Sequence, residues 1–197
     1  MESKIVFGLG LFVVIVSLVA GCRWVARDRT ARPETKILTA GRGEADFVRA
    51  SIHSNIAEIK FAELALTKSA DPALRKIATM LRADHRETLD NLLEIAKHKN
   101  ISLPDLEKIS IEDIASRLPH TGADFDKSWC AEMIGKHEMN FQVLELVWER
   151  TQDEEVREIV NAALPHLIAH LESLVDYQEH YGRRHRDVLS IAEASGN

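Results

Sequence analysis

Several features are scarce or absent in this sequence, and each absence excludes a class of protein. Lys and Arg total 25 against 31 Asp and Glu, for a net charge of −6, so nucleic-acid binding has no electrostatic support. The sequence holds no glycine-rich phosphate-binding loop, no fixed-period repeat and no low-complexity tract. Aromatic residues make up only 6%, whereas Leu, Ile, Ala, Glu and Lys are abundant. This composition favours α-helix.

Long hydrophobic runs are also lacking, apart from one near the N-terminus. The apolar run Ile5–Ala20 follows Lys4 and is shorter than the ~20 residues that a comfortable transmembrane helix needs. It matches the hydrophobic region of a secretory signal peptide, which we predict over residues 1–21. The run closes with Leu-Val-Ala-Gly-Cys, which resembles a lipobox with Val19 where Leu is usual. Cleavage there makes Cys22 the lipid-modified N-terminus.

Lipidation of Cys22 predicts a membrane-anchored lipoprotein of the bacterial cell envelope that faces the periplasm. Arg23 rather than Asp follows the cysteine, which slightly favours the outer membrane. The alternative is an uncleaved N-terminal helix that holds the protein in the inner membrane. Residues 22–43 are charged and lack periodicity, so they are predicted to form the lipid anchor and a flexible tether. Residues 182–197 are predicted to form a C-terminal tail.

Cysteine is scarce as well, because Cys130 is the only one besides Cys22. If Cys22 carries lipid, Cys130 has no intramolecular disulfide partner. An oxidising compartment permits this when the hydrophobic core is large enough. Cys130 lies on an apolar helical stripe, and we therefore predict that it is a buried, small hydrophobic residue.

Residues 44–181 are predicted to form one all-α domain. Hydrophobic periodicity and turn residues divide it into four long helices, at about residues 44–69, 72–99, 123–150 and 153–181. Asp71 as N-cap and Pro72 at the first helical position start the second helix. A long connection, residues 100–122, separates the second helix from the third. Two helical hairpins joined by one long connection are typical of a ferritin-like four-helix bundle, which is the fold we predict.

Each helix carries an apolar stripe that a polar residue interrupts near mid-length. The interrupting residues are Glu58, His85, His137 and His170. Helix midpoints in a bundle share one level whichever way each helix runs, so we expect these four side chains to meet in one interior layer. One carboxylate and three imidazoles form a suitable ligand set for Zn²⁺, Fe²⁺, Mn²⁺ or Cu²⁺. His166, one turn before His170 on the same face, is a candidate additional ligand.

A metal-free alternative remains open for the same layer. Glu58 could pair with a protonated histidine, and the polar layer would then set the register of the helices. Di-iron carboxylate chemistry is disfavoured, because Arg82, Ile134 and Leu167 stand where its Glu-x-x-His motif requires Glu before the three histidines. No nucleophile–base pair is apparent, so no catalytic mechanism is predicted.

Several short motifs resemble those of a known family. They are Asp46-Phe47-Val48, Asn55-Ile56-Ala57-Glu58, Ala83-Asp84-His85, Gly122–Asp126, His137-Glu138 and Leu164–Leu171. In order and spacing they resemble the ferritin-like domain of unknown function 4142, which is common in bacterial secreted and membrane-anchored proteins. The resemblance covers about residues 44–178 and implies the bundle fold. The family's motif positions fall on Glu58, His85, His137 and His170 but do not include His166, and the family implies no activity.

Two functions from different classes are open at this point. The first is an envelope metal-binding protein that acts in metal handling or oxidative-stress defence. The second is a metal-free interaction module of the envelope that binds an unidentified protein partner. Metal should raise the melting temperature only under the first. The second expects an exposed apolar patch on the outer helix faces, where Trp129 and Trp148 are candidates. A metal site with an open position could also support an enzymatic reaction.

Overall fold

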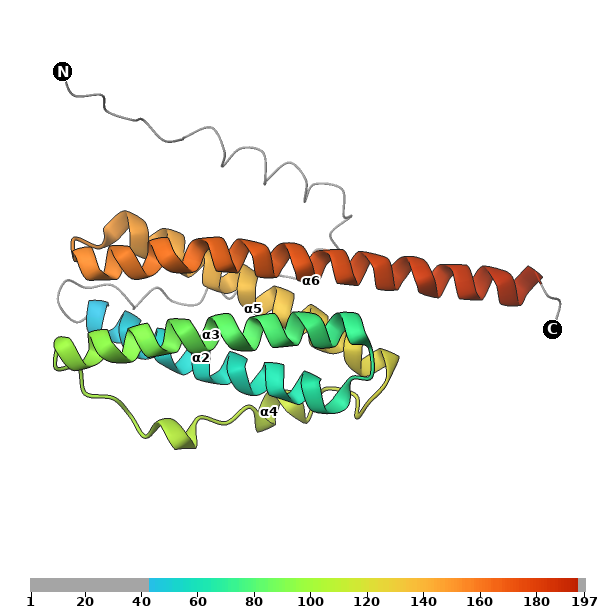
Figure 1. Cartoon of the computed structure of the whole chain (residues 1–197), viewed down its shortest axis with the longest axis horizontal. Coiled ribbons are helices and arrows are strands. Elements are labelled where there is room, and N and C mark those ends of the chain that lie inside the picture. The colour runs from blue at the N-terminus through green and yellow to red at the C-terminus, as the bar shows by residue number, and fades with distance from the viewer. Residues whose placement is uncertain (1–42, 195–197) are drawn as a thin grey trace, which may run out of the picture. The chain divides into compact units, whose positions relative to one another are not determined.

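A computed structural model describes residues 43–194 of the chain, with side chains for residues 43–181 (Figure 1). The predicted signal peptide, the lipidation of Cys22 and the predicted tether up to residue 42 lie outside the described residues. None of the described helices combines the length and the apolar character that crossing a lipid bilayer requires.

Four long helices and a short one make up the described chain. They are α2 (Gly43–Lys68), α3 (Pro72–His98), α4 (Glu112–Ala115), α5 (Ala123–Arg150) and α6 (Glu154–Ala194). The all-α prediction is confirmed, and the long helices begin close to the predicted residues. α6 continues past residue 181, where the sequence predicts its end. No proline stands between Gly182 and Ala194, and a single glycine costs a helix about 1 kcal/mol without ending it.

The first helical hairpin is set by local signals in its turn. Asp71 caps α3, because its side chain accepts a hydrogen bond from the backbone N–H of Ala73 at 2.8 Å, and Pro72 follows at the first helical position. The other end of α3 stops before Asn100, whose φ of 53° is the left-handed conformation that asparagine tolerates.

The segment between α3 and α5 runs back along the domain (Figure 1). It contains a short 3-10 turn, Leu106–Lys108, and then α4. Lys60 of α2 donates a hydrogen bond to the carbonyl of Ile109, whose side chain is buried. The middle of the connection is therefore held against α2. Because the connection runs the length of the domain, α5 starts at the end where α3 begins.

α2 and α5 lie side by side and antiparallel. Near one end, the indole N–H of Trp129 donates to the carbonyl of Phe61 at 2.9 Å. Near the other end, the hydroxyl of Thr151 donates to Glu44 at 3.2 Å. Early residues of one helix thus meet late residues of the other.

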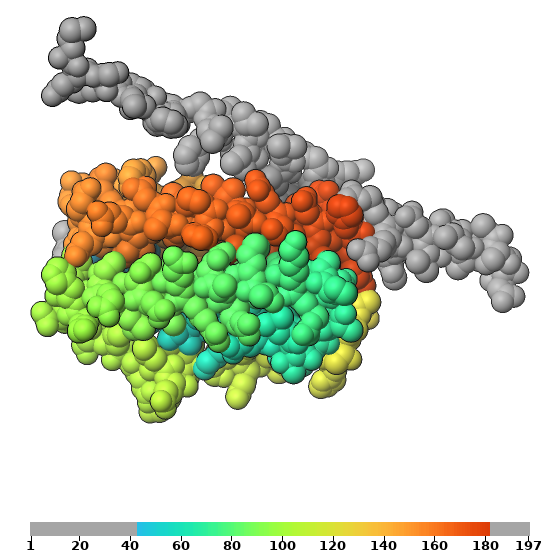
Figure 2. Space-filling model, viewed as in Figure 1, coloured from blue at the N-terminus to red at the C-terminus, as the bar shows by residue number. Residues whose placement is uncertain are grey.

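α3 and α6 have the same antiparallel relation on the face shown in Figure 2. The phenol of Tyr177 donates to Asp71 at 3.0 Å, which joins the start of α3 to the later part of α6. Lys99 lies 2.7 Å from Glu155, which joins the end of α3 to the start of α6. Each long helix therefore packs against two neighbours, and all neighbours are antiparallel.

The hydrophobic core consists of two clusters along the helix axes. One cluster includes Phe61, Leu81, Phe125, Trp129, Met133 and Leu174. The other includes Phe47, Ile52, Leu92, Val147, Val156 and Val160. Burying such side chains stabilises a fold by roughly 25 cal/mol per Å² of apolar surface, so the clusters hold the four helices together on both sides of their midpoints.

The two tryptophans proposed for an outward apolar patch differ in placement. Trp129 is fully buried, so the suggestion that it lies on an outer face is wrong. Trp148 is 38% exposed, and the guanidinium of Arg157 lies 5.1 Å from the centre of its ring. Cys130 is buried, as predicted.

Candidate metal centre

The four residues predicted to form an interior layer come together in the structure. Glu58 comes from α2, His85 from α3, His137 from α5 and His170 from α6. All four are buried, with exposed fractions of 8% or less. They lie between the two hydrophobic clusters, where each helix passes its midpoint with an apolar stripe on either side.

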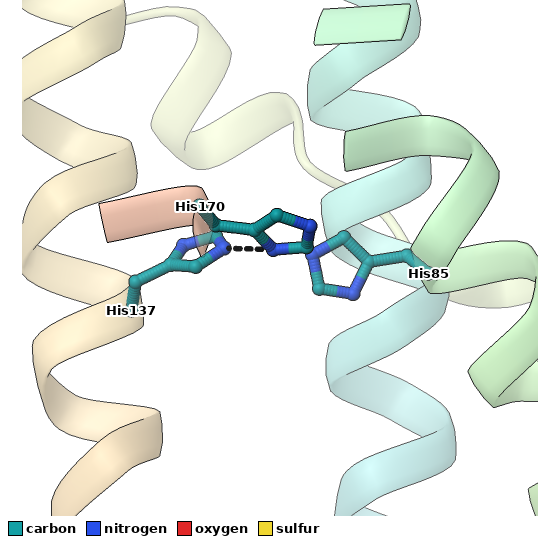
Figure 3. Close-up of side chains that lie close together, drawn as sticks. All are labelled: His85, His137 and His170. Carbon is teal, nitrogen blue, oxygen red and sulfur yellow. Dashed lines mark hydrogen bonds between the residues drawn. The ribbon is translucent and has the colours of Figure 1, made fainter. Parts of the chain in front are cut away.

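The three imidazole rings form a compact group (Figure 3). Their centroids are 5.2 to 5.6 Å apart, and one nitrogen from each ring lies within 4.8 Å of the others. The Nε2 of His137 lies 3.1 Å from the Nδ1 of His170. The Oε2 of Glu58 lies 2.8 Å from the Nε2 of His85 and 3.7 Å from the Nε2 of His137.

The ring of His85 is oriented by an amide. Its Nδ1 lies 2.9 Å from the Oδ1 of Asn55, while the Nδ2 of Asn55 donates to the carbonyl of Ser51 at 2.8 Å. Since the amide nitrogen is already used as a donor, its oxygen faces the ring as an acceptor. This assigns the proton of neutral His85 to Nδ1, and Nε2 keeps its lone pair.

The other two rings are oriented in the same manner. The Nδ1 of His137 lies 2.9 Å from the carbonyl oxygen of Met133, and the Nε2 of His170 lies 2.9 Å from the Oδ2 of Asp84. Carbonyl and carboxylate oxygens only accept, so these two nitrogens donate. The lone pairs of neutral His137 and His170 are thereby left on the two nitrogens that face each other.

The inward nitrogen lone pairs and the Glu58 carboxylate consequently converge without protons between them. His85 Nε2 and Glu58 Oε2 are within ion-pair distance, yet neither has a hydrogen-bond partner in a favourable direction. Atoms that approach this closely without pointing at each other are placed as the ligands of a common third atom would be. Outer acceptors that fix the far nitrogen of each histidine are a regular feature of metal sites.

The second oxygen of Glu58 is held by neutral donors. The Nδ2 of Asn140 donates to Oε1 at 2.7 Å, and the hydroxyl of Ser54 donates to the same atom at 3.0 Å. Burial alone raises the pKa of the Glu58 carboxyl, but its interactions with His85, and to a smaller extent with His137 and the Ser54 hydroxyl, lower it well below its usual range. Glu58 is therefore an anion, with Oε2 directed toward the histidines.

Burial keeps two of the three rings neutral. It lowers the pKa of His137, and it lowers the pKa of His170 to about 4 although the hydrogen bond to Asp84 acts in the opposite direction. A proton shared between these rings is accordingly unfavourable at neutral pH. The close approach of their lone pairs needs a positive charge from another source, and a metal ion could supply it.

A cavity of about 270 Å³ opens beside the centre. Its wall includes Glu58, His85 and His170, and also Asp84 and His166. Most of the remaining wall is apolar and is formed by side chains from the four long helices. Because a water molecule takes about 30 Å³ in the liquid, the cavity has room for several waters or a small molecule beside the centre.

His166, predicted as an additional ligand, does not join the layer of His85 and His137. Its Nδ1 lies 3.4 Å from the Oδ2 of Asp84, and its ring centroid is 6.4 Å from that of His170. Asp84, His166 and His170 form a second group of potential metal ligands, next to the first and sharing His170 with it.

The prediction from the sequence missed three polar residues that lie at the centre. They are Ser54, Asn55 and Asn140, which orient the side chains of Glu58 and His85. A signal for two of them is present in the sequence: Asn55 stands three residues before Glu58, and Asn140 stands three residues after His137. Residues three apart share a helix face, so amides at these positions point toward the same layer.

Comparison with known proteins identifies a family but no individual relative. The model of the family described as Domain of unknown function (DUF4142) matches residues 30–176. Neither the comparison with curated proteins nor the comparison with solved structures yields a match. The family match spans most of the chain, including every residue of the centre. The chain therefore belongs to the DUF4142 family of domains of unknown function.

Proposed function

We propose that this domain binds a divalent transition-metal ion through Glu58, His85, His137 and His170. The observation that carries the proposal is a buried group of three imidazole nitrogens, all within 4.8 Å of one another, with the Oε2 of Glu58 beside it at 2.8 Å from His85 and 3.7 Å from His137. The opposite nitrogen of each ring is held by an acceptor, so the inward nitrogens are free to coordinate.

The donor set indicates the kind of ion. Imidazole nitrogens suit Zn²⁺, Cu²⁺ and Fe²⁺, and a carboxylate oxygen also admits Mn²⁺. One ligand from each of four helices can surround an ion from all sides, as the closed four-coordinate sites of zinc proteins do. In the cell, such a site would serve metal handling or defence against oxidative stress.

We further propose that the fold is a ferritin-like four-helix bundle anchored in the bacterial envelope. Antiparallel packing of all neighbouring helices and the long connection before α5 support the first part. The lipobox-like run ending at Cys22 supports the second. Labelling with a radioactive fatty acid tests the anchor: the wild type should incorporate label and Cys22→Ala should not. A wild type that incorporates no label would leave an uncleaved helix as the alternative.

A metal-free polar layer is the competing function for the same residues. The observation in its favour is the 2.8 Å separation of Glu58 Oε2 and His85 Nε2, which fits an ion pair if His85 is protonated. Such a buried pair would set the register of α2 against α3 and bind no ion.

Elemental mass spectrometry separates the two functions. The full chain is purified without a tag, exposed in turn to Zn²⁺, Cu²⁺, Fe²⁺ and Mn²⁺, and compared with a His85→Ala/His137→Ala double variant. We expect near-stoichiometric metal in the wild type and trace metal in the folded variant. A wild type that retains none of the four ions would contradict the metal proposal and leave the polar layer.

A further inference from the structure

His170 has a chemical partner at each of its two nitrogens. Its Nδ1 faces His137 at 3.1 Å, inside the centre, and its Nε2 faces Asp84 at 2.9 Å, on the side that includes His166. A single ring therefore lies between two groups of potential ligands. The inner group is buried, whereas the outer group includes an exposed side chain.

The outer group has the spacing of a helical metal chelate. His166 and His170 stand four residues apart on α6, so their side chains lie on the same face one turn apart. Two histidines at this spacing on one helix are the zinc ligands of His-Glu-x-x-His sites. Asp84 of α3 reaches across to both rings, with its Oδ2 at 2.9 Å from His170 Nε2 and 3.4 Å from His166 Nδ1.

We propose that Asp84, His166 and the Nε2 of His170 form a second metal position, and that the His170 ring bridges it to the inner ion. The inference rests on the proposed function, because the inner ion is what occupies Nδ1 of the shared ring. The second ion is a divalent transition metal that accepts imidazole, with Cu²⁺ and Zn²⁺ as the best matches to two nitrogens and one carboxylate oxygen.

The charge and proton balance of the two-ion centre is favourable. Binding at Nε2 displaces the proton that this nitrogen donates to Asp84, and the proton leaves to solvent. The bridging ring then carries one negative charge, which adds to those of Glu58 and Asp84. Three negative charges largely offset two divalent ions in a part of the domain where charges are poorly solvated.

The outer position differs from the inner one in access. The side chain of His166 is 47% exposed and that of Asp84 is 24% exposed, while His137 is fully buried. Three protein ligands leave a coordination position open to water, which is the arrangement of catalytic rather than structural zinc sites. The outer ion is therefore the one that exchanges with solvent and meets a small molecule in the cavity.

Metal titration of the full chain tests the second position. With Cu²⁺, followed by elemental analysis after gel filtration, we expect two ions in the wild type and one in His166→Ala. The exposed His180 lies on the same helix, and His180→Ala is the matched control that should keep two. Circular dichroism confirms that each variant is folded, and the exposure of His166 makes this a mild substitution.

Electron paramagnetic resonance tests the shared ring. Two Cu²⁺ ions bridged by one imidazole ring are magnetically coupled, so the integrated signal of the wild type should fall below its copper content. In His166→Ala the single ion should give a full signal. Two copper ions with a full, uncoupled signal in the wild type would overturn the bridge.

The remaining outcomes separate this inference from the proposed function. One ion in both the wild type and His166→Ala would overturn the outer position while the inner centre stands. Two ions in His166→Ala would also overturn it, because the second ion would then bind elsewhere. No ion in either protein would remove the inner centre, and the outer one would fall with it.

Discussion

Two histidine–glutamate pairs in this domain have nearly the same separation and very different surroundings. His85 and Glu58 lie 2.8 Å apart with side chains 11% and 2% exposed. His98 and Glu155 lie 3.0 Å apart at the end of α3, with side chains 75% and 37% exposed. At that surface pair, Lys99 also contacts Glu155 at 2.7 Å.

The difference between the pairs shows where a positive charge is missing. At the surface, a lysine and water solvate the carboxylate, and such an ion pair contributes little to stability. Within residues 43–181, every ion-pair partner of Glu58 is a histidine. The buried carboxylate thus lacks a permanent cation and faces lone pairs instead. A metal ion would resolve this imbalance inside the domain, whereas the surface pair needs none.

Of the tests of this comparison, metal addition should change the stability of the domain most. Zn²⁺ at a thousandfold excess over its dissociation constant stabilises a folded protein by about 4 kcal/mol. For a domain of this size, we expect the melting temperature to rise on the order of 10 °C, measured by circular dichroism, and to fall again with a chelator. Glu58→Gln should remove most of the rise. An identical wild-type melting temperature with and without each metal would contradict the expectation.

Acidification of the metal-free domain should have the next largest effect. His170 has a folded pKa of about 4 against an ordinary value of 6.5, so the unfolded chain takes up the proton first. Stability is therefore highest above about pH 6.5 and falls as the pH drops toward 4, by roughly 3 kcal/mol at 1.36 kcal/mol per pKa unit. The lowered pKa values of His137 and Glu58 act with the same sign.

Urea unfolding at a series of pH values measures this loss. The expected sign is a free energy of unfolding that decreases from pH 7 to pH 4. His170→Gln, which cannot titrate, should make the profile shallower over that range, with the contribution of His137 remaining. A wild-type free energy that stays constant, or rises on acidification, would show that His137 and His170 are not neutral in the folded state.

Loss of the Asn55 amide, which orients His85, should have a smaller effect than the two changes above, and it should appear in the metal affinity. Asn55→Ala removes the acceptor that holds the Nδ1 of His85 and leaves every proposed ligand in place. Changes to such outer partners typically weaken metal binding 10- to 100-fold, and we expect a loss in that range by isothermal titration calorimetry. Asn161→Ala, at an exposed position on α6, is the control. Equal affinity in both variants would argue against an orienting role.

Disrupting the surface pair should have the smallest effect on metal content and stability. Glu155→Gln removes the carboxylate from His98 and Lys99 without touching the centre. We expect unchanged metal content and an unchanged melting temperature, because Lys99 keeps Asp153 as a partner. A loss of metal in this variant would mean that the ion binds at the helix ends rather than at the centre.

The sequence predicts the four helices and the polar layer for a clear reason. Apolar residues at helical spacing identify the buried face of each helix, and a polar residue on that face must lie in the interior. Helix midpoints then place Glu58, His85, His137 and His170 at one level. These inferences depend only on periodicity and length, which are properties of the chain itself.

Finer features depend on geometry that periodicity does not encode. The position of His166 is an example: it shares a face with His170 but lies one turn away, about 6 Å along the axis at 1.5 Å per residue. That shift places it beside Asp84 rather than in the layer of His137. Which ring nitrogen points inward also depends on partners from other helices, such as Asn55 for His85.

One residue from each long helix builds the centre, and this has a consequence for folding. The hairpins α2–α3 and α5–α6 are formed by residues close in the chain, and each holds only two of the four ligands. A complete coordination shell exists only after the two hairpins have docked. During refolding, high-affinity metal uptake should therefore report the docking step, later than the rise of helical content. A spectroscopically visible ion such as Co²⁺ would mark that step in time.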